Sequence, residues 1–462
     1  MLLSSSLSFV LPFLLVSFAL VRATGPLLKT NIGAFEGKRL EFGDAGSVDA
    51  FYGVPFARPP LSELRFEKPV EAEFAPKRAA VAAKPACPQP RAPGFSLQEE
   101  SEDCLFLDVF KPAAPSADGR GRPLLVFVHG GGFQGGSAHH HSTEFFAKTI
   151  ATNGAVLISL QYRLGVLGFA STGEEAFAGN YGLWDLRAAL LWIRKNAAAL
   201  DVDPARITVG GYSAGSAAVG MLTISEETRD LFQQAIQMSG SPFAEWATSE
   251  KSIELTTRVA AHLRCGVLQS AKEVKDCLKT KSVDELLAAF EAAFVRERVA
   301  PPAIFGEKAA EVQSELLDFY VNSSQRPKDR LFYLEQYAKV QFVGCWNDGG
   351  PPNATLSKYG VLFNTRFNPL NDTADDLRFQ KNLLDAIVNF VKNGTPKSAE
   401  SPQFEAVSAK KPLVYSEIST EIQLRNGLFE RELRFYDRLT DDFDFDLIRG
   451  VPKTTRRSRT EL

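Results

Sequence analysis

The segment that decides the fold is residues 206–216, which read RITVGGYSAGS. A short apolar strand, RITVG, runs into the motif GYSAG at 211–215, and small residues typical of a closely packed helix follow. A G-x-S-x-G motif between a strand and a helix predicts a sharp turn that lifts the serine hydroxyl above the sheet, and this turn needs small residues on both flanks. The N-terminus of the following helix would favour negative charge that develops there. The motif therefore indicates Ser213 as a nucleophile.

A second glycine-rich motif, HGGGF at residues 129–133, follows the apolar strand LLVFV at 124–128. Glycines let backbone N–H groups approach closely and point at one oxygen, which is the arrangement of an oxyanion hole for a tetrahedral acyl intermediate. The N–H of Ala214, next to the serine, would be a further donor. The two motifs together predict acyl-transfer chemistry.

The same glycines also match a dinucleotide-binding pattern, Gly130-x-Gly132-x-x-Gly135, placed after a strand. That pattern expects an acidic residue at the end of the next strand, to bind the ribose, and a helix that opens within the motif. The next strand ends LQYR, without Asp or Glu, and Gly135 is followed by GSAHHHST. We therefore favour the oxyanion interpretation and expect no cofactor.

Composition excludes several classes of protein. Of 462 residues, 45% are hydrophobic and 23% are charged, which is typical of a globular chain and argues against disorder or a fibrous repeat. The 52 basic and 55 acidic residues give a net charge of −3, so no global basic excess indicates nucleic acid as a partner. No C-x-x-C or His/Cys spacing indicates a metal site.

Apolar strands alternate with helices along the chain. Strands are expected at 124–128, 155–160, 206–210 and 235–238, helices at 182–196, 282–295, 309–321 and 375–391, and a late strand at 411–416. Continuous apolar strands separated by helices predict an α/β fold with a mostly parallel sheet covered on both faces. Because no internal repeat or low-complexity linker interrupts the pattern, we expect one domain over residues 24–448.

Both ends of the chain carry targeting patterns. Residues 2–21 have no charge and precede small residues near Thr24, which predicts a secretory signal peptide over residues 1–23. A retained anchor helix is the alternative, against which Pro12 and the serines argue. No second apolar run is long enough to span a membrane, so we expect no stable span after cleavage. The basic tail, residues 449–462, ends in RTEL, which is either an ER-retention signal of the K-D-E-L class or an ordinary frayed terminus.

Cysteines and glycosylation sequons agree with an oxidising compartment, extracellular or in the ER lumen. Cys87 and Cys104 are close in sequence, as are Cys265 and Cys277, so each pair would close a short loop and leave Cys345 over. Four N-x-[ST] sequons predict surface glycans. They begin at Asn322, Asn353, Asn371 and Asn393.

The chain resembles the type-B carboxylesterase and lipase family, the cholinesterase-like branch of the α/β-hydrolases. The resemblance runs from about residue 33 to 295 and resumes near 375–439. Besides HGGGF, the matching stretches are GVPFARPP (53–60), EDCLFLDVF (102–110), YRLGVLGF (162–169), GNYGLWDLRAALLWIRKN (179–196) and DPARITVGGYSAGS (203–216).

The resemblance implies an α/β-hydrolase fold and assigns roles to individual residues. It implies Ser213 as nucleophile, with Gly131, Gly132 and Ala214 as oxyanion-hole donors. It also implies the disulfides Cys87–Cys104 and Cys265–Cys277, and a structural ion pair between Arg65 and Glu102.

Two positions depart from the family pattern. Leu186 stands where the family usually has Gln. Tyr212 stands where cholinesterases have Glu, so acetylcholine is not favoured as the substrate.

A larger departure concerns the general base. A serine hydrolase of this type needs a histidine oriented by Glu or Asp, in the chain order Ser, acid, His. The histidines are His129, His139, His140, His141 and His262, and none follows His262. The family's D-E-G-like acid segment and H-G-x-E-like base segment are absent, and near Cys345 the chain reads CWNDGGPPNATLSKYG. The chain is also short for the family, which predicts a fold incomplete in its C-terminal half.

Another histidine could replace the missing base only within hydrogen-bond reach of Ser213 Oγ. His129 is expected to pack inside the oxyanion motif, and His262 to lie on a surface helix. The run 139–141 follows the oxyanion loop and is the candidate near the mouth of the site, although three consecutive histidines are more typical of a solvated loop or a weak metal binder.

The sequence is compatible with two functions, and a third explanation accounts for the missing acid and base segments. The first is a carboxylic-ester hydrolase of the secretory pathway that acts through an acyl-enzyme on a small lipid-like or xenobiotic-like ester. The second is a non-catalytic, esterase-like binding protein, since this fold also serves in adhesion. The third is that the sequence is an incomplete gene product that lacks the exons for acid and base.

Overall fold

The computed structural model describes most of the chain from Gly25 onward. The described residues are 25–90, 99–117, 119–139, 143–242, 244, 246–247, 251–266, 270–299, 374–397, 404, 414–418, 421–427, 434–435, 438, 441–442, 445–446 and 451–452. The expected signal peptide, the helix at 309–321, Cys345 and the RTEL tail lie outside these residues.

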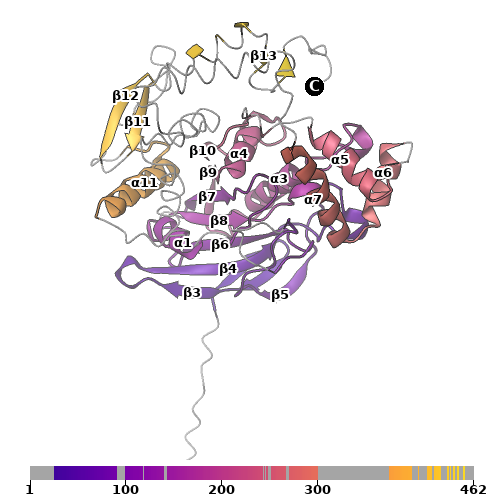
Figure 1. The fold of residues 1–462 in the computed structure, drawn as a ribbon. Helices are drawn as coiled ribbons and strands as arrows, with labels where there is room; N and C mark the ends of the chain where they lie inside the picture. Colours follow the sequence, from indigo (N-terminus) through magenta and orange to yellow (C-terminus); the bar gives the residue numbers. More distant parts are fainter. Residues whose placement is uncertain are drawn as a thin grey trace, which may run out of the picture.

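In the described chain, strands form a central sheet and helices pack around it (Figure 1). The strands are β1 Leu27–Thr30, β2 Gly33–Glu36, β3 Lys38–Glu41, β4 Ser47–Pro55, β5 Ala75–Ala79, β6 Phe106–Pro112, β7 Arg122–Val128, β8 Val156–Leu160, β9 Val202–Tyr212, β10 Gln234–Met238, β11 Val414–Ile418, β12 Ile422–Asn426, β13 Phe445–Asp446 and β14 Val451–Pro452. The helices are α1 Thr143–Thr152, α2 Gly165–Phe169, α3 Tyr181–Lys195, α4 Ala214–Ile224, α5 Lys251–His262, α6 Ala271–Lys279, α7 Val283–Val299 and α11 Ala374–Asn393. Short 3-10 turns occupy η1 Gly43–Ala45, η2 Ser62–Leu64, η3 Glu175–Phe177 and η4 Arg229–Leu231.

Seven strands form the main sheet, in the order β10-β9-β7-β8-β6-β4-β3. The pairings among β10, β9, β7 and β8 are parallel, because helices α1, α3 and α4 cross over between these strands. The pairings of β8 with β6, β6 with β4 and β4 with β3 are antiparallel. The sheet is therefore mixed, and the predicted parallel arrangement applies to the four strands that lead to the two glycine-rich motifs.

The two faces of the sheet bury separate apolar clusters. On one face, side chains of the central strands pack against α3 and α4 in a cluster that includes Val126, Ile158, Leu190 and Val219. On the other face, α1 and α11 cover a cluster that includes Phe127, Leu157, Phe146 and Ile387. Alternate residues of one strand enter opposite clusters, which is why these strands are apolar throughout.

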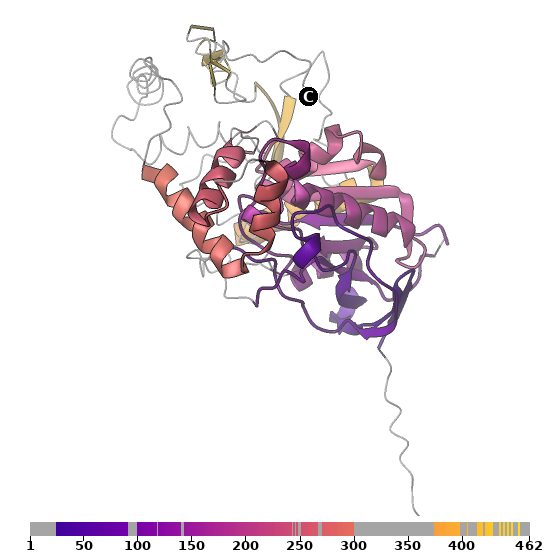
Figure 2. The ribbon, with the colours of Figure 1, turned by 90° about the vertical axis from the view of Figure 1, so that its right-hand side faces the viewer.

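Helices α5, α6 and α7 form a third apolar cluster beside the sheet (Figure 2). Their buried residues pack against α2 and against Phe66, Phe177 and Tyr181. Helix α6 begins with a capping box, in which the Ser270 side chain accepts from the Glu273 N–H and the Glu273 carboxylate accepts from the Ser270 N–H. A sequence-encoded start of this kind fixes the position of the helix after Cys265.

Most predicted elements have counterparts in the structure. The helices expected at 182–196, 282–295 and 375–391 correspond to α3, α7 and α11, and the strand expected at 411–416 is shifted to β11. The sequence prediction missed β3, β4 and β6. Apart from the main sheet, β1, β2 and β5 form a small sheet, and β11 and β12 form a hairpin.

Both predicted disulfides are present in the structure. The Cα atoms of Cys87 and Cys104 are 5.0 Å apart, and those of Cys265 and Cys277 are 5.8 Å apart. The predicted ion pair is also present, since Arg65 donates to both carboxylate oxygens of Glu102 at 2.6 and 2.5 Å. Arg65 also donates to the carbonyls of Lys279 and Lys281 and so ties α6 to the N-terminal region.

Within the described part of the chain, no helix is both long enough and apolar enough to cross a membrane.

We predict that Asp185→Asn will lower the free energy of unfolding by about 3–5 kcal/mol, because the change removes one partner of a buried ion pair. Asp185 is fully buried and accepts from the Arg163 backbone N–H at 3.0 Å, from Nε at 2.8 Å and from Nη2 at 2.7 Å. Urea unfolding measures the loss. The control is Glu254→Gln, which breaks the exposed pair with Arg258 and should change stability little; equal effects of the two changes would contradict the prediction.

Candidate active site

Ser213 stands where β9 turns into α4. Its φ of 54° and ψ of −121° lie in a region that side-chain-bearing residues rarely adopt. Holding such a residue costs on the order of 1–3 kcal/mol, and the surrounding structure must impose it. The Ser213 N–H donates to the carbonyl of Met238 on β10 at 2.8 Å, and its carbonyl accepts from Ala217 at 3.0 Å. The predicted sharp turn is present.

The two glycines of the motif allow this turn to close. A Cβ on Gly211 would lie 2.4 Å from the carbonyl carbon of Gly215. A Cβ on Gly215 would lie 2.2 Å from the carbonyl oxygen of Val128, at the end of β7. Helix α4 therefore packs its first turn directly on the strand that leads into HGGGF.

This packing brings the oxyanion motif beside the serine. A Cβ on Gly130 would lie 2.9 Å from the Cβ of Ser213 and 2.6 Å from the carbonyl oxygen of Tyr212. Gly131 and Gly132, with φ of +125° and +63°, then turn the chain back, and the Gly131 carbonyl accepts from the N–H groups of Gln134 and Gly135 at 3.0 Å each.

Ala214 is the first residue of α4, where backbone N–H groups have no partner within the helix. The predicted donors thus come from the Gly131–Gly132 turn and the first turn of α4, which adjoin Ser213 from two sides. The end of a helix that points its N–H groups at this place favours an anion there.

The three described histidines have different surroundings. His129 is buried, stacks on Tyr162 with ring centres 4.6 Å apart, and its carbonyl accepts from the Tyr162 hydroxyl at 3.0 Å. His262 is exposed at the end of α5, as predicted. His140 and His141 lie outside the described residues.

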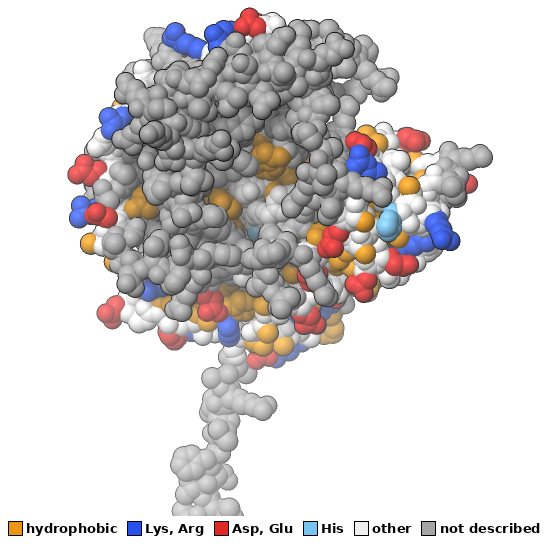
Figure 3. Space-filling view, viewed as in Figure 1, with side chains coloured by type: hydrophobic (Ala, Val, Ile, Leu, Met, Phe, Trp, Pro, Cys, Tyr) orange, Lys and Arg blue, Asp and Glu red, His pale blue; other side chains and the backbone are white. Residues whose placement is uncertain are grey.

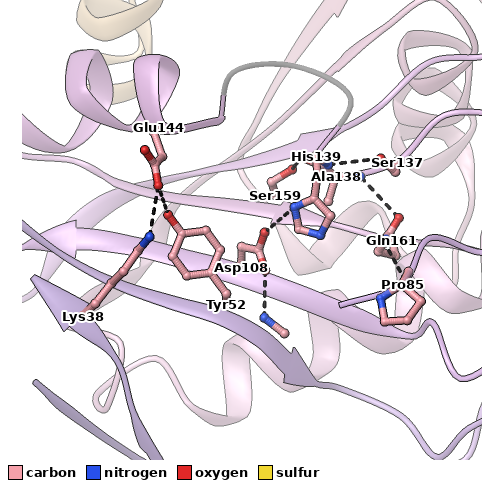
Figure 4. Close-up of polar contacts among 11 residues, drawn as sticks. Lys38, Tyr52, Pro85, Asp108, Ser137, Ala138, His139, Glu144, Ser159 and Gln161 are labelled. Carbon is pink, nitrogen blue, oxygen red and sulfur yellow. Dashed lines mark hydrogen bonds and ion pairs between the residues drawn. The ribbon is translucent and has the colours of Figure 1, made fainter. Parts of the chain in front are cut away.

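His139 faces a buried carboxylate of the sheet (Figure 4). Its Nδ1 lies 3.0 Å from Oδ2 of Asp108 on β6, and the two side chains are 16% and 2% exposed. Burial opposes protonation of the imidazole, but the hydrogen bond and negative charge of Asp108, with the Lys84 carbonyl, outweigh it, so the His139 pKa is raised. In the part of the chain that the structure describes, no histidine is hydrogen-bonded to Ser213 Oγ.

A cavity of about 420 Å³ opens beside the oxyanion motif. Its walls are largely apolar and include Gly132, Phe133, Phe169, Met221, Trp246 and Phe290. Phe133 packs against Phe169 with ring centres 5.1 Å apart and lies 6.4 Å from the ring of Trp246. The chain segment that follows the oxyanion glycines therefore forms one wall of an apolar chamber suited to a hydrocarbon or aryl group.

The two departures from the family pattern are accommodated in different ways. Leu186 is buried in the cluster beneath α3, where an apolar side chain suits its neighbours. Tyr212 packs against the cluster of α1 and α11, and burial raises the pKa of its phenol, so that it stays neutral near pH 7.

On the face shown in Figure 3, acidic and basic side chains of the described residues are interspersed rather than segregated. No broad area of one sign is formed by the described side chains there.

The sequence prediction missed Asp108 as a member of this region. Its signal is the charged residue inside the alternating strand LDVF at 107–110, where one face is apolar. A charge in a buried strand needs a partner, but the sequence does not reveal that the partner is His139.

Residues 24–318 match the carboxylesterase family. Because that match covers more than half of the chain, the protein belongs to the carboxylesterase family, and its fold is therefore of the α/β-hydrolase class.

Relatives of two kinds are similar to the chain. Gut esterase 1 of Caenorhabditis briggsae is 39% identical, and that of Caenorhabditis elegans 28%; the alignments cover 95% and 94% of this chain and 97% of each relative. Neuroligin-3 of Mus musculus is 34% identical over 61% of this chain and 39% of the relative.

The esterase alignments are also longer than the part of this chain that they cover. The alignment with the Caenorhabditis elegans protein extends over 557 residues, whereas 94% of this 462-residue chain is about 434. More than a hundred aligned positions of the relative therefore have no counterpart here.

We predict that Gly215→Ala will destabilise the protein, although alanine normally favours a helix over glycine by about 1 kcal/mol. The added methyl would lie 2.2 Å from the Val128 carbonyl oxygen, so α4 must move away from β7. Thermal unfolding should show a clear loss. The control is Gly43→Ala, whose φ is +59° and whose Cβ would meet nothing within 4 Å, so only the backbone preference is affected. A Gly215→Ala protein as stable as wild type would contradict the close approach.

The raised His139 pKa predicts a pH-dependent stability with a definite sign. The protonated imidazole binds Asp108 in the folded state, so this contribution is complete below the unfolded pKa of about 6.5 and is lost as pH rises through the higher folded pKa. The melting temperature of wild type should exceed that of His139→Gln near neutral pH, and this difference should shrink as the pH rises to mildly alkaline values. His262→Gln, which changes an exposed histidine, should track wild type at every pH; a wild-type advantage that grows with pH would contradict the assignment.

Proposed function

We propose that the protein is a carboxylic-ester hydrolase of the secretory pathway that uses Ser213 as its nucleophile. The observation that carries the proposal is the strained Ser213 at the β9–α4 turn, packed against Gly130 of the HGGGF motif. A serine raised above a sheet, beside glycine N–H groups and a helix N-terminus, suits attack on a carbonyl carbon.

The proposed reaction has two steps. Ser213 Oγ attacks the ester carbonyl, and the N–H groups of Gly131, Gly132 and Ala214 stabilise the oxyanion of the tetrahedral intermediate. Expulsion of the alcohol leaves an acyl-serine, and attack of water on that ester then releases the acid and restores Ser213. In each step a proton must pass from the attacking oxygen to the leaving oxygen.

The substrate class is proposed from the cavity. An apolar chamber walled by Phe133, Phe169 and Trp246 fits the hydrocarbon or aryl part of a lipid-like or xenobiotic-like ester. Tyr212 stands where cholinesterases have Glu, so we do not propose acetylcholine as the substrate.

Turnover is expected to be slow because the general base is missing from the sequence. No histidine follows His262, and His139 is engaged with Asp108. The esterase relatives have more than a hundred aligned positions without a counterpart in this chain, which agrees with a chain that is short for its family. In the described main sheet, β10 is the last strand on the side of Ser213, which is consistent with a short chain.

The second candidate is a non-catalytic, esterase-like binding protein. This proposal is supported by two points: no histidine among the described residues is hydrogen-bonded to Ser213, and part of the chain is similar to neuroligin-3, a protein not named as an esterase. An incomplete gene product is the third explanation for the missing acid and base segments. Sequencing the transcript across residues 295–375 tests whether exons that encode them are absent.

A secretory location is proposed from the two disulfides, the signal-peptide pattern and the sequons. Of the four sequon asparagines, Asn393 lies in the described chain, exposed at the end of α11. ER retention by RTEL stays a proposal beside ordinary secretion.

We predict that an organophosphonate probe will label Ser213 slowly but stoichiometrically, and that hydrolysis of a p-nitrophenyl ester will be several powers of ten below ordinary esterase rates. Loss of a triad base costs roughly 10⁶-fold in rate in a well-studied protease. Intact-mass spectrometry with peptide mapping measures the labelling, and absorbance measures turnover. Ser213→Ala should abolish labelling, whereas the surface change Ser62→Ala should not.

The outcomes separate the candidates. Absence of labelling in folded protein would reject the hydrolase and favour the binding protein. Ordinary turnover that depends on Ser213 would show that a base exists; its loss when His139, His140 and His141 are replaced together would locate that base in the histidine run.

A further inference from the structure

The segment after the oxyanion glycines, residues 136–139, is held by buried polar side chains. Gln89 binds Gly136 on both sides, since its Oε1 accepts from the Gly136 N–H at 2.8 Å and its Nε2 donates to the Gly136 carbonyl at 3.0 Å. The Ala138 N–H donates to Gln161 Oε1 at 3.2 Å, and the Ala138 carbonyl accepts from Ser159 Oγ at 3.2 Å. Gln89, Gln161 and Ser159 are 7%, 1% and 1% exposed.

The last residue of this segment carries the ion pair with the sheet. Asp108 lies on β6, where its Oδ1 accepts from the Gly53 N–H of β4 at 2.8 Å and its Oδ2 faces His139 Nδ1 at 3.0 Å. The carboxylate is therefore fixed on one oxygen by a neighbouring strand and binds the loop with the other (Figure 4).

The held segment packs directly on the oxyanion turn. A Cβ on Gly136 would lie 2.3 Å from the Gly130 carbonyl oxygen and 2.7 Å from His129 Nδ1. A Cβ on Gly131 would lie 1.9 Å from the Gly135 carbonyl oxygen. Because these two loop segments pack against each other without space between them, a displacement of residues 136–139 must displace residues 130–132.

We propose that the Asp108–His139 ion pair positions the oxyanion loop: it anchors residues 136–139 to strand β6 and thereby fixes the N–H groups of Gly131 and Gly132 beside Ser213. His139 is thus a positioning residue and not a substitute for the missing base. The part that concerns Ser213 rests on the proposed hydrolase function, whereas the anchoring of the loop does not.

The arrangement makes the loop sensitive to the charge of His139. The neighbouring titratable groups are Tyr52 on β4, which donates to Glu144 of α1 at 2.5 Å, Glu144 itself, and Lys38 of β3, which pairs with Glu144 at 3.3 Å. Burial raises the pKa of Tyr52, and the Tyr52 hydroxyl lowers that of Glu144, so neither changes charge near neutral pH. Lys84, whose ammonium lies 6.0 Å from the ring centre of Phe106, contributes its backbone carbonyl to His139.

The direction of the effect follows from the ion pair. At pH below the folded pKa of His139 the imidazolium binds Asp108 and the loop is held. As pH rises through that value the attraction is lost and the loop loosens.

The experiment measures the loop and the serine separately. Hydrogen exchange by mass spectrometry follows amides 130–139 from pH 6 to 9, after correction for intrinsic exchange, and phosphonate labelling of Ser213 follows the site. The variants are Asp108→Asn, which removes the negative charge, and His139→Gln, which keeps a donor but cannot titrate. The matched control is Asp49→Asn, which removes another buried carboxylate of the same sheet, on β4, whose partner Arg39 lies 2.8 Å away.

We expect Asp108→Asn to speed exchange of amides 130–139 and to slow labelling of Ser213, each by about tenfold, because small displacements of catalytic donors cost one to two powers of ten in rate. Relative to His139→Gln, wild type should lose protection and labelling rate as pH rises. Asp49→Asn should change neither readout. Unchanged exchange in Asp108→Asn, or an equal change in Asp49→Asn, would overturn the proposal.

The two proposals fail in different ways. If wild-type Ser213 is never labelled but exchange of 130–139 responds to Asp108→Asn, the loop anchor stands and the hydrolase function falls. If labelling occurs but neither readout responds to Asp108→Asn, the reverse holds.

Discussion

The contact on which the site depends is the approach of the first turn of α4 to the end of β7. Gly215 has no side chain, so its backbone can sit against the Val128 carbonyl, and this distance sets the strained turn at Ser213. The same contact brings Gly130 against Ser213, because Gly130 follows β7 by two residues. A methyl group at position 215 would force α4 and the end of β7 apart and so separate the two motifs. The two glycine-rich stretches are therefore one structural unit, although 77 residues separate them in the sequence.

The elements around this unit were predictable from the sequence because each has a strong local signal. The strand and helix on either side of GYSAG are marked by an apolar run and by small residues, and α3 shows a clear helical period. The antiparallel strands β4 and β6 escaped prediction because they mix apolar residues with Asp49 and Asp108, whose ion pairs with Arg39 and His139 form only in the folded protein. The anchor of the oxyanion loop could not be predicted for the same reason. A run of three histidines indicates a solvated loop, and only the folded structure shows that His139 has a carboxylate partner.

The three described histidines have different surroundings, and none of them is hydrogen-bonded to Ser213 Oγ. His129 packs on Tyr162 and His139 binds Asp108, so both contribute to the shape of the loop, and His262 lies at the surface. The glycine-rich turn of HGGGF and the first turn of α4 lie beside Ser213.

The Cys87–Cys104 disulfide gains a second meaning from its neighbours. Gln89, which holds Gly136 on both sides, also donates to the carbonyl of Cys87 at 3.1 Å, and Gln161 donates to the carbonyl of Pro85 at 3.2 Å. The bridge thus closes the segment that supplies the anchor of the oxyanion loop. Formation of this anchor is consequently coupled to oxidation of the two thiols. Before the bond forms, the segment that carries Gln89 is not closed and the loop lacks a fixed partner, so the held conformation of residues 136–139 is expected only under oxidising conditions.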